Sequence, residues 1–371
     1  MVEGNIFEEL EDSRQDWKIM HSMTEIMTVV MCGVSAGEMT VHGIYTFAKI
    51  KEGWLKKSTG LKFPNGLPSY DTIRRTLGII DPKQFQALFI KWIESELGCP
   101  AGSYVSFDGK TVRGSGNEEE GVKPLHLLHA YSHELGIVLG QKECTRDKTN
   151  EITVSKALFD ALKLENAVIT ADAMMCQKDF ARKITSKKSK NNGYVLAVKG
   201  NQPELEKDIT DFFKCEGGES RKSLETFDKG HGRMERRIYT IDTDTGWFAG
   251  RKEWAGLAAF GKCESRVTVT KTGKETAETR YFITTLTDEK RFAEAVRSHW
   301  AIENNLHWSL DVIFREDESP VIERNTAENL AIIRRIIYNR IKMQPDYDTL
   351  SFGRRGCMYD DDFRARILFS C

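Results

Sequence analysis

Two strand-like runs that each end on an aspartate constrain the fold of this chain most strongly. The run "YVSF" at 104–107 consists of strand-forming residues and leads directly to Asp108, and the nearly all-apolar run "NAVITADAM" at 166–174 contains Asp172 where its apolar part ends. The second run has the composition of a central strand in a parallel sheet, which is buried on both faces. Because a buried carboxylate is costly unless a positive charge meets it, we expect the two acids to share a cation.

The pattern of apolar and turn residues around these acids predicts an alternation of strands and helices from residue 101 onward. A hairpin is expected at 125–143, helices at 150–164 and 178–190, and a buried strand at 194–199 that ends on Lys199. Short strand-like runs separated by glycine-rich turns then indicate a β-rich insertion at about 215–287. With a helix expected at 203–213, where Pro203 stands in the first turn, the order before the insertion is strand, strand, strand, helix, strand, helix, strand, helix.

A third acid, Glu303, is expected on the helical segment 291–310. At 100° per residue, steps of three and four return to the same face of a helix, so Glu303 shares a face with the following residues: Val296, Trp300, His307 and Leu310. Glu294 lies on the opposite side and should face solvent. Asp311, about 80° further round the helix, remains a rival third acid.

Two acids at strand ends and one on a helix, in this order of elements, predict an α/β (α+β, mixed-sheet) RNase H-like fold with the triad Asp108, Asp172 and Glu303. Three carboxylates can hold two Mg²⁺ ions that clamp the attacking and leaving oxygens of a phosphoryl transfer. Hard oxygen ligands favour Mg²⁺, with Mn²⁺ as the alternative. An aspartate after a strand is, taken alone, more often a turn former, and Glu303 could instead pair with a core arginine.

The chain divides by pattern into three parts. Residues 1–100 carry apolar residues at helical spacing and form an N-terminal helical domain. Residues 101–320 form the catalytic domain with its β-rich insertion, and residues 321–371 form a C-terminal helix and tail. Within the first part, "GLPSYDTIRRTLGII" places Arg74 and Arg75 on a short helix, so this domain is a candidate DNA-binding unit.

Overall charge and cysteine usage limit the classes of protein. The chain has 54 Lys plus Arg and 55 Asp plus Glu, a net charge of -1, so nucleic-acid binding must depend on local basic patches. Eight scattered cysteines without a CxxC pair argue against a disulfide framework and a zinc site. The apolar stretch 23–40 is short and flanked by acids, so we expect neither secretion nor membrane insertion. A cytoplasmic protein fits these features best.

Several sequence blocks resemble those of H-repeat-associated insertion-sequence transposases, a bacterial branch of the DDE superfamily. They are "SFDGKTVRGS", "ITADAMMCQKDFA", "YVLAVKGNQPEL", "GHGRMERR" and "SHWAIENNLHWSLDVIFREDES". The blocks "GLPSYDTIRRTL" and "DPKQFQALFIKW" resemble the N-terminal domain associated with the same family. The resemblance implies Asp108, Asp172 and Glu303 as catalytic residues and metal ligands.

The sequence departs from the broader superfamily around Glu303. Where the superfamily tends to carry Tyr, Arg and a later Lys, this chain has Val296, His299 and Leu310. Phosphate contacts usually assigned to that Arg and Lys must therefore come from elsewhere, with His299 as one candidate.

Basic and polar residues near the three acids are candidate DNA contacts, because they would neutralise backbone phosphates. They are Lys110, Arg113, Lys199, Asn201, Arg233, Arg237 and His299. Trp247 and Trp254 in the insertion could stack on a base, although ordinary packing explains them better. In "HLLHAYSH", His126 and His129 would point to opposite faces of a strand, which disfavours a zinc site.

The resemblance implies a transposase that binds double-stranded DNA at the ends of its own mobile element and cleaves and joins the strands. Transposition needs two ends held together, so a homo-oligomer on DNA, associated with the bacterial nucleoid, is expected. Two alternatives remain open: a nuclease of the same fold that does not join strands, and an inactive DNA-binding relic.

Overall fold

The computed structural model describes residues 6–98, 102–144, 149–189, 191–230, 232–344 and 348–369. In this part of the chain, the strands form one nine-stranded mixed sheet in the order β3-β2-β1-β4-β5-β9-β8-β7-β6. Their bounds are β1 Tyr104–Val112, β2 Leu125–Ser132, β3 Ile137–Glu143, β4 Val168–Ala171, β5 Gly193–Val198, β6 Arg221–Gly230, β7 Arg233–Asp242, β8 Ala259–Val269 and β9 Glu275–Thr284. The domain boundary expected at residues 100 and 101 lies outside the described residues.

The first five strands form the centre of the molecule. Strand β1 pairs in parallel with β4 and antiparallel with β2, and β4 pairs in parallel with β5. Parallel neighbours need a crossover connection, which α6 (Thr149–Leu162) and α7 (Lys178–Ile184) supply. The predicted hairpin is β2 and β3, and the prediction of a mixed α/β sheet is confirmed.

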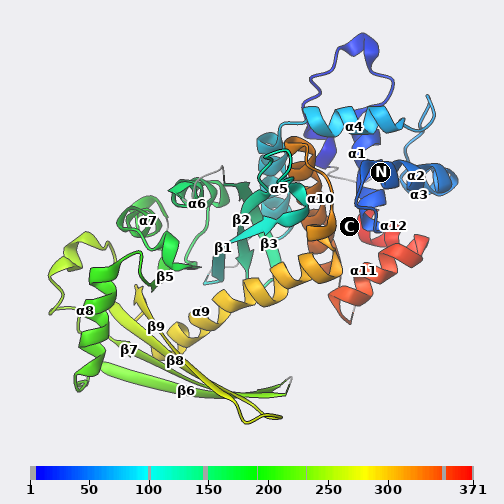
Figure 1. Ribbon diagram of the computed structural model, residues 1–371. Helices are drawn as coiled ribbons and strands as arrows, with labels where there is room; N and C mark the ends of the chain where they lie inside the picture. The colour runs from blue at the N-terminus through cyan, green and yellow to red at the C-terminus, as the bar shows by residue number, and fades with distance from the viewer. Residues whose placement is uncertain are drawn as a thin grey trace.

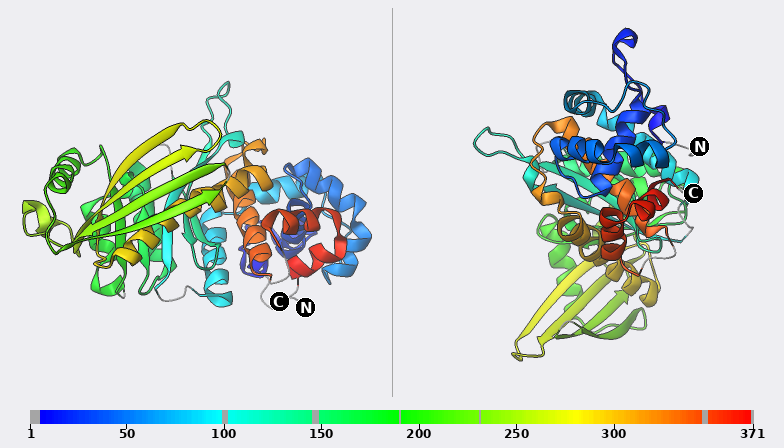
Figure 2. Two further views of the ribbon diagram at one scale, coloured as in Figure 1. Left: turned by 90° about the horizontal axis from the view of Figure 1, so that it is seen from below. Right: turned by 90° about the vertical axis from the view of Figure 1, so that its right-hand side faces the viewer.

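Strands β6 to β9 follow α8 (Pro203–Lys214) and extend the same sheet. Strand β9 pairs with β5, so the β-rich insertion continues the central sheet and projects away from the helical end of the molecule (Figure 2). Trp254 is buried, and Trp247 stacks on Phe212 with ring centroids 4.6 Å apart. Both tryptophans therefore serve the packing of this region.

The remaining helices gather at the other end of the molecule, where the two ends of the chain meet (Figure 1). They are α1 Met23–Ser35, α2 Val41–Ile50, α3 Glu52–Ser58, α4 Tyr70–Ile79, α5 Pro82–Glu96, α10 Arg324–Lys342, α11 Leu350–Tyr359 and α12 Asp361–Phe369. Ser22 and Glu25 form a capping box at α1, and Ser69 caps α4. The segment 321–371, expected to be one helix and a tail, contains three helices: α10, α11 and α12.

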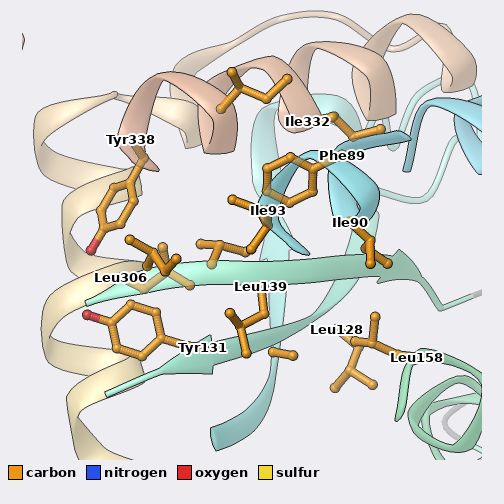
Figure 3. Close-up of a cluster of buried hydrophobic side chains, with 14 of the residues drawn as sticks. Phe89, Ile90, Ile93, Leu128, Tyr131, Leu139, Leu158, Leu306, Ile332 and Tyr338 are labelled. Atoms are coloured by element: carbon orange, nitrogen blue, oxygen red, sulfur yellow. The ribbon is translucent and has the colours of Figure 1, made fainter. Parts of the chain in front are cut away.

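Helices α5 and α10 join this helical end to the sheet. Figure 3 shows Phe89 and Ile93 of α5 and Ile332 of α10 packed over Leu139 of β3. These side chains are almost completely buried, and each contributes about 1.5–3 kcal/mol of transfer free energy. No helix in the described residues is long and apolar enough to cross a membrane.

Candidate active site

The register of β1 and β4 brings the first two acids together. The last paired residues of the two strands are Phe107 and Ala171, so the next position on each strand is an acid, Asp108 or Asp172. Strand β1 does not end at Asp108, as its sequence suggested, but continues along β2 to Val112. Only its pairing with β4 ends there, and this frees one side of β1 beside both carboxylates.

The third acid lies on a helix that changes its period. Helix α9 runs Glu289–Ala301, and two π-helical segments follow, Ile302–His307 and Ser309–Ile313. The N–H of Trp308 donates to the carbonyl of Glu303, five residues back, as in a π-helix. Glu303 is exposed, so the prediction that it shares the buried face is wrong, whereas His307 and Leu310 of the same predicted face are buried.

Glu294 lies within α9, before the change at Ile302, and follows the α-helical period. It is exposed, as predicted, and accepts a hydrogen bond of 2.8 Å from the hydroxyl of Tyr104. The same helix is anchored to β1 by the hydroxyl of Ser106, which donates to the carbonyl of Ser298 at 3.2 Å. The π-helical segment consequently begins next to the strand that carries Asp108.

Electrostatics shows that the three acids are neighbours. The pKa of Asp108 is raised to about 7, chiefly by burial and also by the negative charges of Asp172 and Glu303, against the opposing effects of His299 and the Gly109 N–H. The pKa of Asp172 is lowered, chiefly by a hydrogen bond of 3.2 Å with His299 Nε2. One carboxyl is thus mostly protonated below neutral pH while its neighbour remains ionised.

His307 extends the site inward, and sequence reasoning assigned it no role. Its Nδ1 lies 3.5 Å from Asp108 Oδ2. Burial lowers the pKa of His307 to about 3, with Lys110 and Arg335 as further causes, so the ring is neutral. Its ring lies edge-on to that of His129, the cross-strand partner of Asp108, with centroids 5.4 Å apart.

A buried ion pair supports these two rings. Arg335 of α10 donates to His129 Nε2 at 3.0 Å and forms a two-pronged pair with Glu316, with a distance of 2.9 Å on one side. Because arginine is always a donor, His129 Nε2 is the acceptor. Of the histidines first considered for zinc, His129 thus belongs to this buried network, while His126 bonds Glu151 at 2.7 Å. A histidine spacing alone does not distinguish such roles.

Lys110 takes part in a second internal cluster. It is buried, and its Nζ lies 2.5 Å from Asp311 Oδ1 and 3.2 Å from Asp317 Oδ1. Asp317 also accepts a hydrogen bond of 3.0 Å from the backbone N–H of Arg113. These contacts fasten the segment after the π-helix to the end of β1. Asp311 is thereby held by a lysine, and the geometry does not favour a DNA contact by Lys110.

The other predicted DNA contacts have different surroundings. The exposed ones are Arg113, Lys199, Asn201 and Arg233, and Asn201 donates to the carbonyl of Ala173, directly after Asp172. Arg237 is buried, with its guanidinium 2.6 Å from Glu235 and 3.3 Å from Asp228. Its charge is satisfied inside the protein, so it is not placed to meet DNA.

The donors at this site fit a hard divalent cation by chemistry. Carboxylate oxygens are the ligands that Mg²⁺ and Mn²⁺ prefer, and the mutual repulsion that acts on Asp108 is what a bound cation would relieve. In the arrangement of the described residues, however, no three metal-ligating side chains converge on one point. Asp172 is turned toward His299 instead. For one metal ion to contact all three acids, the carboxylates of Asp108, Asp172 and Glu303 would have to move toward one another.

The mixed core carries Asp108 and Asp172 at equivalent positions after the β1–β4 pairing, and Glu303 follows α9 on the far side of the insertion. Together with the family match, this core places the chain in the class of DDE transposases. The family model described as "Transposase DDE domain" matches residues 100–340, and that described as "DDE_Tnp_1-associated" matches residues 5–93. The chain belongs to this family, within its H-repeat-associated branch, and its core is RNase H-like.

Two relatives from Escherichia coli illustrate the similarity. "Putative transposase YncI" of strain O157:H7 is 37% identical over 340 residues, which are 90% of this chain and 85% of the relative. "H repeat-associated putative transposase YhhI" of strain K12 is 34% identical over 337 residues, which are 89% of this chain and 87% of the relative. The similarity therefore spans both the helical end and the sheet.

Proposed function

We propose that this chain binds the ends of its own insertion sequence and cleaves and joins DNA strands there. Asp108, Asp172 and Glu303 would hold Mg²⁺, or alternatively Mn²⁺. The bound ions would stabilise the attacking and leaving oxygens of an in-line phosphoryl transfer. Because two ends must be held together, the acting form would be a homo-oligomer on DNA in the bacterial cytoplasm.

The observation that carries this proposal is the shared electrostatics of the three acids. The pKa of Asp108 is raised to about 7, first by burial and then by the charges of Asp172 and Glu303. Perturbed carboxyls of this kind cluster at functional sites. Asp108 and Asp172 occupy equivalent positions on neighbouring parallel strands, and the first π-helical segment carries Glu303 beside them.

The residues around the acids have supporting roles in this proposal. His299 orients Asp172, and neutral His307 faces Asp108 from the buried side. Lys199 and Arg113, which are exposed, would contact backbone phosphates and fix the position of the DNA.

The test is incubation of the purified chain with labelled DNA that carries candidate element ends, with Mg²⁺ and with EDTA. Metal-dependent nicks at the element end together with joined products are expected. Asp108→Asn should bind the same DNA and give neither product. Cleavage without joining would identify a nuclease instead.

Two observations favour a second candidate, an inactive DNA-binding relic. Among the residues that the structure describes, no three metal-ligating groups converge, and the superfamily positions at 296, 299 and 310 carry Val, His and Leu. This candidate predicts DNA binding with no product at any concentration of Mg²⁺ or Mn²⁺.

A further inference from the structure

The β-rich insertion presents two arginines to the helix that leads to Glu303. Arg237 of β7 pairs with Ser265 of β8, and Arg280 of β9 pairs with Cys263 of β8. Because Cys263 and Ser265 are two residues apart, all four side chains lie on one face of the sheet. Helix α9 packs on this face, where Val296 and Cys263 belong to one buried cluster. Both arginines therefore lie on the α9 side of the sheet.

The side chain that they meet is Trp300, three residues before Glu303. The guanidinium of Arg237 lies 4.4 Å from the centre of the indole ring, and that of Arg280 lies 5.0 Å from it. A cation over an aromatic face is attracted by the negative charge of the ring's π-electrons. Trp300 thus holds two arginines from the insertion next to the catalytic helix.

The two arginines differ in what remains available to a ligand. Arg237 is buried and occupied by Asp228 and Glu235. The side chain of Arg280 is 42% exposed and forms two hydrogen bonds with Glu278, at 2.8 and 3.1 Å. A guanidinium has five N–H donors in a rigid plane, so three donors of Arg280 are not used by Glu278.

Arg280 lies beside the acids. The β5–β9 ladder ends with Val198 opposite Tyr281, so the next residues are Lys199 on one strand and Arg280 on the other. Strand β5 is the parallel neighbour of β4, after which Asp172 follows. The hydrogen bond from His299 lowers the pKa of Asp172 most, and the charges of Arg280 and Lys199 lower it further.

We propose that Arg280, whose guanidinium lies 5.0 Å from the centre of the Trp300 ring at the edge of the acidic site, binds a DNA backbone phosphate next to the cleaved bond. This inference rests on the proposed function. The planar fork of arginine matches a phosphate in two hydrogen bonds, and in this chain the superfamily's arginine position is occupied by His299. The insertion supplies the missing guanidinium from another part of the chain, with Trp300 and Arg237 as positioning residues.

The experiment compares Arg280→Ala and Arg280→Lys with Arg366→Ala as a matched control. Arg366 of α12 is also exposed and also lies over a ring, that of Phe363 at 5.1 Å, but α12 belongs to the opposite end of the molecule from β9 (Figure 1). Affinity for element-end DNA is measured in EDTA at several salt concentrations, and cleavage is measured in Mg²⁺.

Loss of one phosphate contact lowers the slope of log affinity against log salt by about 0.9, and we expect this loss in Arg280→Ala alone. The rate of cleavage by Arg280→Ala should fall at least about tenfold, which corresponds to an increase of about 1.4 kcal/mol in the activation free energy. Arg280→Lys should keep the slope, because the charge remains, and should recover cleavage only in part, because the planar fork is lost.

Neutral methylphosphonate links, placed one at a time along the DNA, locate the contact. One position near the cleavage site should weaken binding by the wild-type chain and by Arg366→Ala, yet leave Arg280→Ala unaffected. The proposal is overturned if Arg280→Ala is as sensitive as the wild-type chain to a neutral link at every position. It is also overturned if Arg280→Ala and Arg366→Ala have equal slopes of log affinity against log salt. A wild-type chain that shows the Arg280-dependent slope but never cleaves refutes the proposed function and leaves this contact standing. A chain that does not bind DNA refutes both.

Discussion

The pKa of Asp108 leads to a prediction about stability rather than activity. Its side chain is only 20% exposed, and its pKa rises from 3.8 to about 7, first because of burial and then because of Asp172 and Glu303. A carboxyl whose pKa is higher in the folded state than in the unfolded state binds its proton more tightly when folded. Raising the pH from about 4 to about 7 therefore destabilises the metal-free protein through this group. Asp108→Asn removes that penalty.

The magnitude follows from the pKa difference. Each pH unit inside this window changes the free energy of unfolding by about 1.4 kcal/mol for one group. Between pH 5 and pH 7, the stability of Asp108→Asn relative to wild type should increase by about 2.3 kcal/mol, roughly fiftyfold in the unfolding equilibrium, because folded Asp108 is already half-ionised at its pKa of about 7. Below pH 4 both folded and unfolded Asp108 are protonated, so the pH dependence of the difference should disappear.

The assay is urea unfolding at pH 5, 6, 7 and 8 in EDTA, with Asp228→Asn as a control without a pH slope. A hydrogen bond from Arg297 lowers the pKa of Asp228, so this carboxyl is ionised in both the folded and the unfolded state throughout this range. Any stability that its replacement costs should therefore be the same at all four pH values. Added Mg²⁺ should stabilise the wild-type chain and leave Asp108→Asn unchanged, because a ligand that binds only the folded state raises its stability. A stability difference between Asp108→Asn and wild type that stays constant from pH 5 to pH 8 would refute this reasoning.

Three further substitutions separate the metal ligands from the internal ion pairs. Glu303→Gln should abolish cleavage in Mg²⁺ while DNA binding in a gel-shift assay persists, because it removes only an exposed charge; normal cleavage would exclude Glu303 as a ligand. Asp311→Asn should lower the midpoint of thermal unfolding, because buried Lys110 loses a partner at 2.5 Å; an unchanged midpoint would contradict the role given to that pair. Glu316→Gln should cost about 3–5 kcal/mol in urea unfolding, because it leaves buried Arg335 without its counter-charge; a cost below about 1 kcal/mol would show that the pair is dispensable.

The order of elements and two of the three acids' positions could be predicted from local pattern. The apolar run before Asp172 fits only a strand that is buried on both faces, and the two crossover helices force β1, β4 and β5 to lie parallel. The hairpin and the strand-rich insertion follow likewise from turn residues and alternation. These features depend on residues that are close together in the sequence, so the sequence is enough to predict them.

The helix register could not be predicted in this way. A 100° step places Glu303 on one face with His307 and Leu310, and these two residues are buried, but Glu303 itself is exposed. The π-helical segments that begin at Ile302 were also not predicted, because apolar spacing indicates a helix and not its hydrogen-bond pattern.

The sequence by itself determined the family, the alternation of strands and helices and the acids that the strands deliver, because each depends on a local run of residues. Only the tertiary structure decided which charges remain free. Lys110 and Arg237 are basic residues in the right blocks, yet both are buried against carboxylates: Lys110 against Asp311, far away in the chain, and Arg237 against Glu235 of its own strand and Asp228 of the neighbouring strand. Arg280 carries no sequence signal, yet the antiparallel register of β5 and β9 places it beside Lys199. Ion pairs depend on distances of a few ångströms, and folding sets those distances between residues that the sequence keeps far apart.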